Sequence, residues 1–97
     1  MENKNKYENV IIITGGFTQE EYKKSLKNIT EKIKNIIDIE KIEEIGKKKL
    51  AYEVKKNTEG WYVVIYFKAI NQNILELERF YRINEDIIKF ITVKIDD

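Results

Sequence analysis

The fold is decided by residues 57–68, which read NTEGWYVVIYFK. Residues typical of a turn come first, and a run of β-branched and aromatic residues follows. Side chains alternate between the two faces of a strand, so the odd positions from Trp61 to Phe67 share one face. The even positions from Tyr62 to Lys68 share the other. The stretch predicts a turn over 57–60 and a strand over 61–68.

Three further strands are predicted on either side of this one. Residues 39–54 alternate between apolar and polar side chains, with a slip in the alternation near Gly46. Such a slip indicates a bulge or bend at the glycine. The apolar run Tyr7 to Thr14 indicates a buried strand, and a last strand is expected from about Ile87 to Ile95.

Two helices are predicted between the strands. The first begins at Thr18, which forms a capping-box pattern with Glu21. From Tyr22 to Ile36, apolar side chains recur at the spacing of one helix face. Asn71 is expected to cap the second helix, whose apolar face extends to Tyr81.

The resulting order β-α-β-β-α-β is that of a ferredoxin-like split βαβ fold in the α+β class. The expected architecture is a four-stranded antiparallel sheet with two helices on one face. All 97 residues are expected to form this single domain, 1–97. A fold of this kind supports many functions, so function has to be argued from particular residues.

Composition restricts the chemistry. The chain has no cysteine and no histidine, which excludes disulfides and removes the commonest general base and metal ligand. Acidic neighbours such as Glu20-Glu21 and Glu85-Asp86 are explained by a helix cap and a turn. Gly15-Gly16 suits a strand-to-helix turn better than a phosphate site, because no phosphate-binding motif follows. We therefore expect no enzyme, no cofactor and no metal.

No apolar run approaches the roughly 18 residues that span a bilayer, so the expected protein is soluble and cytoplasmic.

Excess positive charge is concentrated in one segment: residues 46–60 hold 5 lysines against 2 glutamates, although the net charge of the chain is only +1. On a strand, Lys47 and Lys49 project to one side and Lys48 to the other. Such a run on a strand is more often a solvated edge that resists aggregation, and phosphate binding is the alternative.

Aromatic residues offer a second candidate surface. Tyr62, Tyr66 and Phe90 are expected on the helix-free face of the sheet, where they could stack on single-stranded bases. The sequence signature of base-stacking sheets is absent, so cross-strand packing or contact with a protein is the favoured interpretation.

Four blocks of sequence occur in a fixed order: KYE at 6–8, EEIGKKKLAY at 43–52, EGWY at 59–62 and LERFYRINEDI at 77–87. In order and spacing they resemble the bacterial small-subunit ribosomal protein S-six family. That family has E-x-x-G-K-R-K-L-A-Y, then E-G-Y-Y, then L-E-R-x-x-R-L-D-E-D-V at the last three blocks. The resemblance covers nearly the whole chain.

The resemblance implies a structural role on the small ribosomal subunit, without catalysis. It implies binding to the central domain of small-subunit ribosomal RNA as a pair with the small basic protein S-eighteen. Carried over by position, it makes eight residues candidates for contact with RNA or partner: Lys6, Tyr7, Lys47, Lys48, Lys49, Arg79, Arg82 and Lys89. Arg79 and Arg82 are neighbours on a helix surface and could clamp a phosphate, or Arg79 could pair with a nearby glutamate.

The chain departs from the family pattern in three places. Glu53 replaces the proline usual after the L-A-Y triplet, Lys48 stands where arginine is common, and the loop over 14–18 lacks the family's proline and aspartate. These departures leave open a divergent paralogue that acts as a protein-interaction module through its sheet. A small-ligand regulatory domain is a further alternative, and an enzyme comes last.

Overall fold

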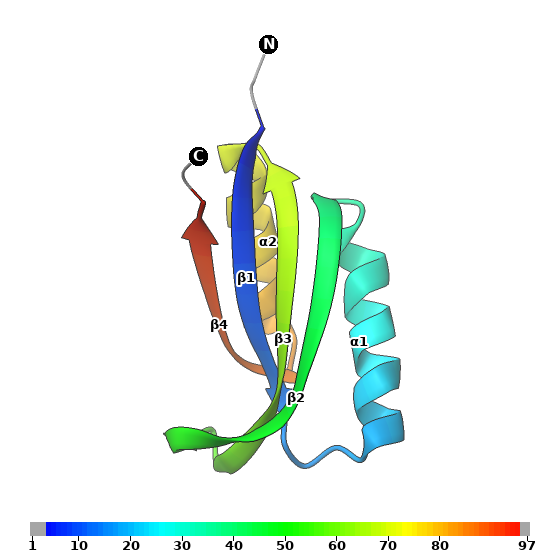
Figure 1. The fold of residues 1–97 in the computed structure, drawn as a ribbon, viewed down its shortest axis with the longest axis vertical. Helices are drawn as coiled ribbons and strands as arrows, with labels where there is room; N and C mark the ends of the chain where they lie inside the picture. Colours follow the sequence, from blue (N-terminus) through cyan, green and yellow to red (C-terminus); the bar gives the residue numbers. More distant parts are fainter. Residues whose placement is uncertain (1–3, 96–97) are drawn as a thin grey trace.

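The computed structural model describes residues 4–95. The elements in chain order are β1 (Asn5–Thr14), α1 (Gln19–Ile33), β2 (Asp38–Val54), β3 (Asn57–Ala69), α2 (Asn71–Ile83) and β4 (Ile87–Lys94). The strands form one antiparallel sheet in the order β2-β3-β1-β4. The predicted α+β, ferredoxin-like architecture is confirmed, with α2 behind the sheet and α1 beside β2 (Figure 1).

The core lies between the sheet and both helices. Alternation along β1 and β3 buries Ile11, Ile13, Val63, Ile65 and Phe67 on one face, each without exposed surface. The apolar side chains of both helices join these in a single cluster. Both helices therefore cover the same face, and the other face is free of helices. We call this second side of the sheet the open face.

The first helix begins as predicted. Thr18 accepts a hydrogen bond from the Glu21 amide at 3.2 Å, and the Glu21 carboxylate accepts from the Thr18 amide at 2.8 Å. Tyr22 follows directly and stacks on Trp61 of β3, with ring centroids 4.4 Å apart. The cap thus fixes the helix start at the point where its first core residue meets the sheet.

The start of the second helix differs from the prediction. Its N-cap is Ile70, which makes no capping hydrogen bond, so the expected cap by Asn71 is wrong. Asn71 is instead the first helical residue, and its Oδ1 accepts a hydrogen bond from the Tyr7 hydroxyl at 2.7 Å. The amide side chain ties α2 to β1 and is not available to the helix end.

The hairpin between β2 and β3 extends well beyond the core. Gly46 has a positive φ of 110° and lies where the register shifts, which confirms the predicted bulge. The expected turn over 57–60 is wrong, because these residues already belong to β3. The chain reverses at Lys55 and Lys56, both with positive φ, of 47° and 66°. We call residues 46–60 the distal ribbon.

Within residues 4–95, no helix is both long and apolar enough to cross a membrane.

Candidate functional site

The distal ribbon places five lysines beyond the core. Lys47, Lys48 and Lys49 lie on β2, and Lys55 and Lys56 form the turn. Lys47 pairs with Trp61 across the strands, and its ammonium lies 5.5 Å from the centre of the indole ring. Among residues 4–95, no carboxylate lies within ion-pair distance of any of the five. The ribbon therefore presents an excess of positive charge to solvent, five lysines against Glu53 and Glu59.

The ribbon bends over the open face toward β4 (Figure 1). The Lys89 ammonium donates to the Tyr52 hydroxyl at 2.9 Å and lies 5.0 Å from the centre of the ring. This hydrogen bond lowers the pKa of the Tyr52 hydroxyl. A small cavity of about 80 Å³ lies beneath, between Ile12 and Tyr62 of the sheet and Leu50 of the ribbon. Lys89 thus holds the ribbon against the sheet as well as adding to its charge.

Gly60 makes this bend possible. A side chain here would meet the Ile12 side chain and would lie 3.3 Å from the backbone oxygen of Ile13. The absence of a Cβ lets Ile12 and Ile88 fill the space below the ribbon, and both are buried although they lie away from the helices. Packing of apolar side chains therefore extends locally onto the open face.

The open face also carries exposed or partly exposed aliphatic side chains on β1, β3 and β4, beside the charged Glu8 and Lys41. Ile91 and Val93 of β4 are 50% and 47% exposed, and Val10 lies beside Ile91 in the register. Val64 is the neighbour of Val10 on β3. Four aliphatic side chains thus form a continuous patch across three strands, which is the kind of surface that protein interfaces use. We call it the aliphatic patch.

The expected aromatic set on this face is only partly present. Tyr62 and Tyr66 lie on the open face, and the Lys41 ammonium is 5.8 Å from the ring centre of Tyr66. Phe90 lies on the other face, because it pairs with buried Ile11 and contacts the Tyr81 ring at 5.4 Å between centroids. The placement of Phe90 on the open face was wrong, and the two tyrosines alone leave no three-ring platform.

Arg79 and Arg82 lie on α2, on the opposite side of the molecule from the aliphatic patch. Both are exposed, and among residues 4–95 neither has a carboxylate within ion-pair distance. The expected alternative, pairing of Arg79 with a nearby glutamate, is not seen. Leu75 and Ile83, four residues before and after Arg79, are 73% and 71% exposed. The outer surface of α2 thus combines two guanidinium groups with two aliphatic side chains.

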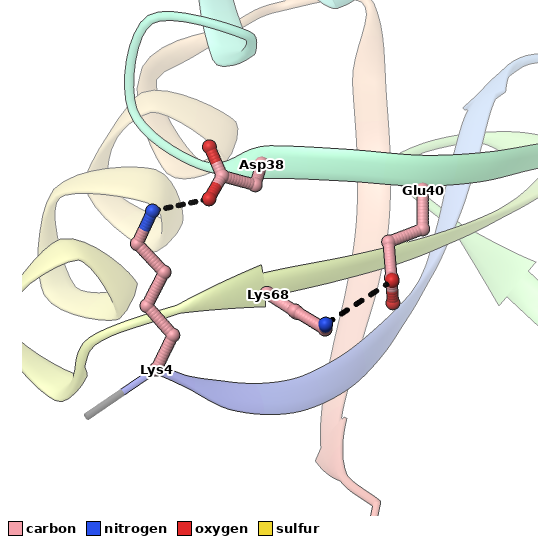
Figure 2. Close-up of polar contacts among 4 residues, drawn as sticks. All are labelled: Lys4, Asp38, Glu40 and Lys68. Carbon is pink, nitrogen blue, oxygen red and sulfur yellow. Dashed lines mark hydrogen bonds and ion pairs between the residues drawn. The ribbon is translucent and has the colours of Figure 1, made fainter.

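Lys6 lies at the far end of the sheet from the ribbon. It is exposed and stands opposite Lys68 on β3. Figure 2 shows that nearby lysines at this end are paired: Lys68 with Glu40 at 3.7 Å, and Lys4 with Asp38. No carboxylate lies within ion-pair distance of Lys6 among the described residues.

Tyr7 is placed in the core. Its side chain is 6% exposed, stacks on Phe67 and donates to Asn71. Burial leaves it no surface for RNA or a partner, so its part is to hold β1 against β3 and α2. The sequence could not show this, because a tyrosine beside a lysine suits either role.

The structure therefore separates the candidate residues into three places. Lys47, Lys48 and Lys49 lie on the distal ribbon and Lys89 contacts the ribbon through Tyr52, whereas Lys6 and the arginines of α2 lie elsewhere. Sequence reasoning missed the parts of Tyr52 and the aliphatic patch. Alternation along β4 could have indicated the patch, but a bulge in that strand interrupts it. Within residues 4–95, no group of three or more acidic side chains could hold a metal ion.

Comparison with known proteins decides the family. The family model described as Ribosomal protein S6 matches residues 6–94. The chain belongs to this family. A crystal structure of 30S ribosomal protein S6 from Thermotoga maritima superposes with a TM-score of 0.86 at 37% identity, covering 96% of this chain and 89% of that chain.

Curated relatives agree with this assignment. The small ribosomal subunit protein bS6 of Thermotoga petrophila is 43% identical over 94 residues, which are 91% of this chain and 70% of that protein. The bS6 of Helicobacter acinonychis is 45% identical over 91 residues, 93% of this chain and 64% of that protein. The chain thus spans about two thirds of the length of these relatives. Members of the S6 family are structural ribosomal proteins, so the chain is not an enzyme and its place is the cytoplasmic ribosome.

Proposed function

We propose that this S6-family chain is a structural constituent of the small ribosomal subunit and binds the central domain of small-subunit ribosomal RNA together with ribosomal protein S-eighteen. The single observation that carries the proposal is the family match over residues 6–94, with relatives that are small-subunit proteins. The geometry supports the proposal, because the lysines proposed to contact RNA and the apolar side chains proposed to contact a protein lie on different parts of the molecule.

The distal ribbon is the proposed main RNA contact. Phosphate oxygens are the commonest protein contacts on nucleic acids, and lysines without internal partners are free to reach them. Lys47, Lys48 and Lys49 are the proposed phosphate contacts on the ribbon, with Lys89 at its base. Lys6, Arg79 and Arg82 are proposed as further contacts, to RNA or to the partner. The buried Tyr7 is not included.

The aliphatic patch is the proposed contact for S-eighteen. A net charge of +1 gives little general attraction to RNA, so binding by this chain alone would be weak. A basic partner that covers Ile91 and Val93 would bury apolar surface and bring additional positive charge to the same RNA. Cooperative binding follows from these two surfaces.

The test is binding of the pair to a transcript of the central domain across a range of salt concentrations. Each lost phosphate contact lowers the salt slope by roughly 0.7 to 0.9. We expect the triple variant Lys47→Gln, Lys48→Gln, Lys49→Gln to lower the slope by about 2 to 3. A matched control, Lys23→Gln, Lys27→Gln, Lys34→Gln, removes the same charge from α1 and its C-cap residue and should leave the slope close to that of the unmodified protein. Equal effects of the two variants would contradict the proposed RNA contact.

The exposed aliphatic patch also favours a second candidate, a protein-interaction module that uses the open face without RNA. In that case the chain would still form a pair with S-eighteen, and removing the ribbon lysines would not change that binding. The salt titration above distinguishes the two.

A further inference from the structure

Tyr52 of the distal ribbon differs from the other aromatic residues of this chain in its exposure to solvent. It is 64% exposed, whereas every other aromatic residue among 4–95 is buried or partly buried. Packing in the core therefore does not explain why an aromatic residue stands at this position. Lysines flank it along the chain, with Lys49 three residues before it and Lys55 three residues after it.

The contact with Lys89 leaves the ring of Tyr52 accessible. The Lys89 ammonium is 2.9 Å from the hydroxyl oxygen and 5.0 Å from the ring centre, so it lies at the hydroxyl end of the ring and not over its middle. The hydroxyl oxygen accepts this hydrogen bond and keeps its own proton for a further one. A ligand at this point would thus meet an open aromatic ring with a cation at its edge.

The charge around Tyr52 is positive in excess, although it is not uniform. With Lys89 included, six lysines stand against two carboxylates, those of Glu53 and Glu59. Both glutamates are exposed, and among residues 4–95 neither lies within ion-pair distance of Lys89 or of a ribbon lysine. The lysines are therefore not engaged by these carboxylates, and their excess favours an anionic ligand.

This combination of groups suits single-stranded RNA better than a protein. Protein interfaces are enriched in tyrosine but depleted in lysine, and lysine is the commonest residue around Tyr52. Sites for single-stranded nucleic acid combine positive charge along the backbone with aromatic rings on which bases stack. In a duplex the bases stack on one another, so an exposed ring can receive a base only from an unpaired segment.

We infer that Tyr52 stacks on an unpaired base of the RNA, with Lys89 contacting a phosphate beside that base. The inference rests on the proposed RNA binding of the distal ribbon, and it names the part of the RNA that the ribbon contacts. That part is a loop, bulge or junction nucleotide and not a continuous duplex. The lysines supply attraction that depends on salt, and Tyr52 supplies a contact that does not depend on charge.

A salt titration separates stacking from the part that Tyr52 plays in holding the ribbon. The pair of this chain with S-eighteen is titrated against the central-domain transcript. Tyr52→Leu removes the ring, and the loss of one stacked base should lower affinity roughly 5- to 150-fold at every salt concentration. The salt slope should stay the same, because the ring carries no charge.

Two further variants complete this titration. Tyr52→Phe loses the hydrogen bond to Lys89 but keeps the ring, so it should lose much less affinity than Tyr52→Leu. The matched control is Tyr66→Leu, the same change at a partly buried tyrosine of the open face outside the ribbon, and it should leave affinity unchanged. Because Tyr52 is exposed, its variants should fold normally, which circular dichroism would check.

A photochemical measurement identifies the contacting base. Ultraviolet irradiation of the complex joins bases to the side chains that they contact, and the cross-linked tryptic peptides are identified by mass spectrometry. Trypsin cleaves after Lys49 and Lys55, so residues 50–55 form a peptide whose only aromatic residue is Tyr52. We expect this peptide to be cross-linked to a nucleotide that is unpaired in the transcript, and we expect the cross-link to be lost in Tyr52→Leu.

Several results would overturn the inference. Equal losses of affinity in Tyr52→Leu and Tyr52→Phe, or a lower salt slope in Tyr52→Leu, would show that Tyr52 only holds the ribbon in place. Cross-linking of residues 50–55 to paired nucleotides alone would also contradict stacking. Weaker pairing of Tyr52→Leu with S-eighteen in the absence of RNA would assign the ring to a protein contact instead.

The lysine variant distinguishes failure of this inference from failure of the proposed function. If Lys47→Gln, Lys48→Gln, Lys49→Gln lowers the salt slope as expected, the results above overturn stacking by Tyr52 alone. An unchanged slope in the lysine variant would overturn the RNA contact of the ribbon itself, and the stacking inference with it.

Discussion

The side chains that fix the register of this fold are polar as well as apolar. Asn9 is completely buried at the centre of β1. Its Nδ2 donates to the Thr92 hydroxyl at 2.7 Å, and its Oδ1 accepts from the Tyr81 hydroxyl at 2.8 Å. The Asn9 side chain thus connects β1 to β4 and to α2, and both of its polar atoms are hydrogen-bonded. A one-residue slip of β1 would break both bonds, so they specify a single alignment.

Tyr81 makes the stability of this network sensitive to alkaline pH. Burial raises the pKa of its hydroxyl well above the ordinary value of about 10. Above about pH 10 the unfolded chain loses this proton while the folded chain keeps it, so the free energy of unfolding falls as pH rises. The contribution is up to about 1.4 kcal/mol per pH unit until the folded pKa is reached.

We therefore predict that Tyr81→Phe makes the decline of unfolding free energy above about pH 10 shallower. Urea denaturation at a series of pH values measures this slope for both proteins. Tyr22, whose pKa burial also raises, is retained in the variant and serves as an internal reference. Parallel slopes for the two proteins would show that Tyr81 does not carry the effect.

Among the elements, the β2–β3 hairpin contains a locally strained turn. Lys55 and Lys56 both have positive φ, which costs a non-glycine residue roughly 1 kcal/mol or more. Hairpin turns of this kind favour asparagine followed by glycine. Two lysines in these positions therefore lower the stability of the ribbon while adding charge at its tip, as a phosphate contact would require.

Replacing Lys56 by glycine should stabilise the protein by about 1 kcal/mol and reduce the salt slope of RNA binding. The control Lys48→Gly removes the same charge from the β2 strand and should destabilise the protein instead, because glycine weakens a strand. Thermal unfolding and the salt titration together measure both effects. A loss of stability in Lys56→Gly would contradict the assignment of strain to this turn.

The elements differ in how far the sequence predicted them. The capping box at Thr18 and the bulge at Gly46 follow from local chemistry, so both were predicted. The turn at Lys55 was missed because its two central residues, Lys55 and Lys56, are neither glycine, asparagine nor aspartate. Phe90 was misplaced because β4 carries a bulge: Ile12 pairs with Lys89 and Ile13 with Ile87, which leaves Ile88 over. Counting from Ile87 therefore gives the wrong face for Phe90.

The candidate site was predicted less completely than the fold. A run of lysines at 47–49 is visible in any sequence, but their freedom from internal ion pairs depends on which strands lie nearby. The role of Tyr52 requires the ribbon to bend over the sheet, and Gly60, which permits the bend, is explained only by its contact with Ile12. The burial of Tyr7 could not be predicted for the same reason, since burial is a property of the assembled sheet.

At the scale of the whole molecule, a nearly neutral chain presents separate surfaces. The distal ribbon is basic, the aliphatic patch is apolar, and the arginines of α2 face the other way. We predict that Ile91→Asp with Val93→Asp abolishes co-purification with S-eighteen, because two charges cannot be buried in an apolar interface without partners. Both side chains are about half exposed, so folding should be retained, as circular dichroism would check.

A matched control replaces the exposed apolar residues of α2, with Leu75→Asp and Ile83→Asp. These changes introduce the same charge on the opposite side and should leave the pair intact. Loss of the pair in the α2 variant but not in the open-face variant would place the partner on α2 and contradict the account of the aliphatic patch.

The most direct test of the central claim is sedimentation of a cell lysate through a sucrose gradient, with this chain followed across the fractions. Incorporation into the small ribosomal subunit predicts that it co-migrates with that subunit at low salt and is released as salt is raised. Recovery only in the free-protein fractions at low salt would contradict the account, and would identify a paralogue that keeps the fold and binds another partner.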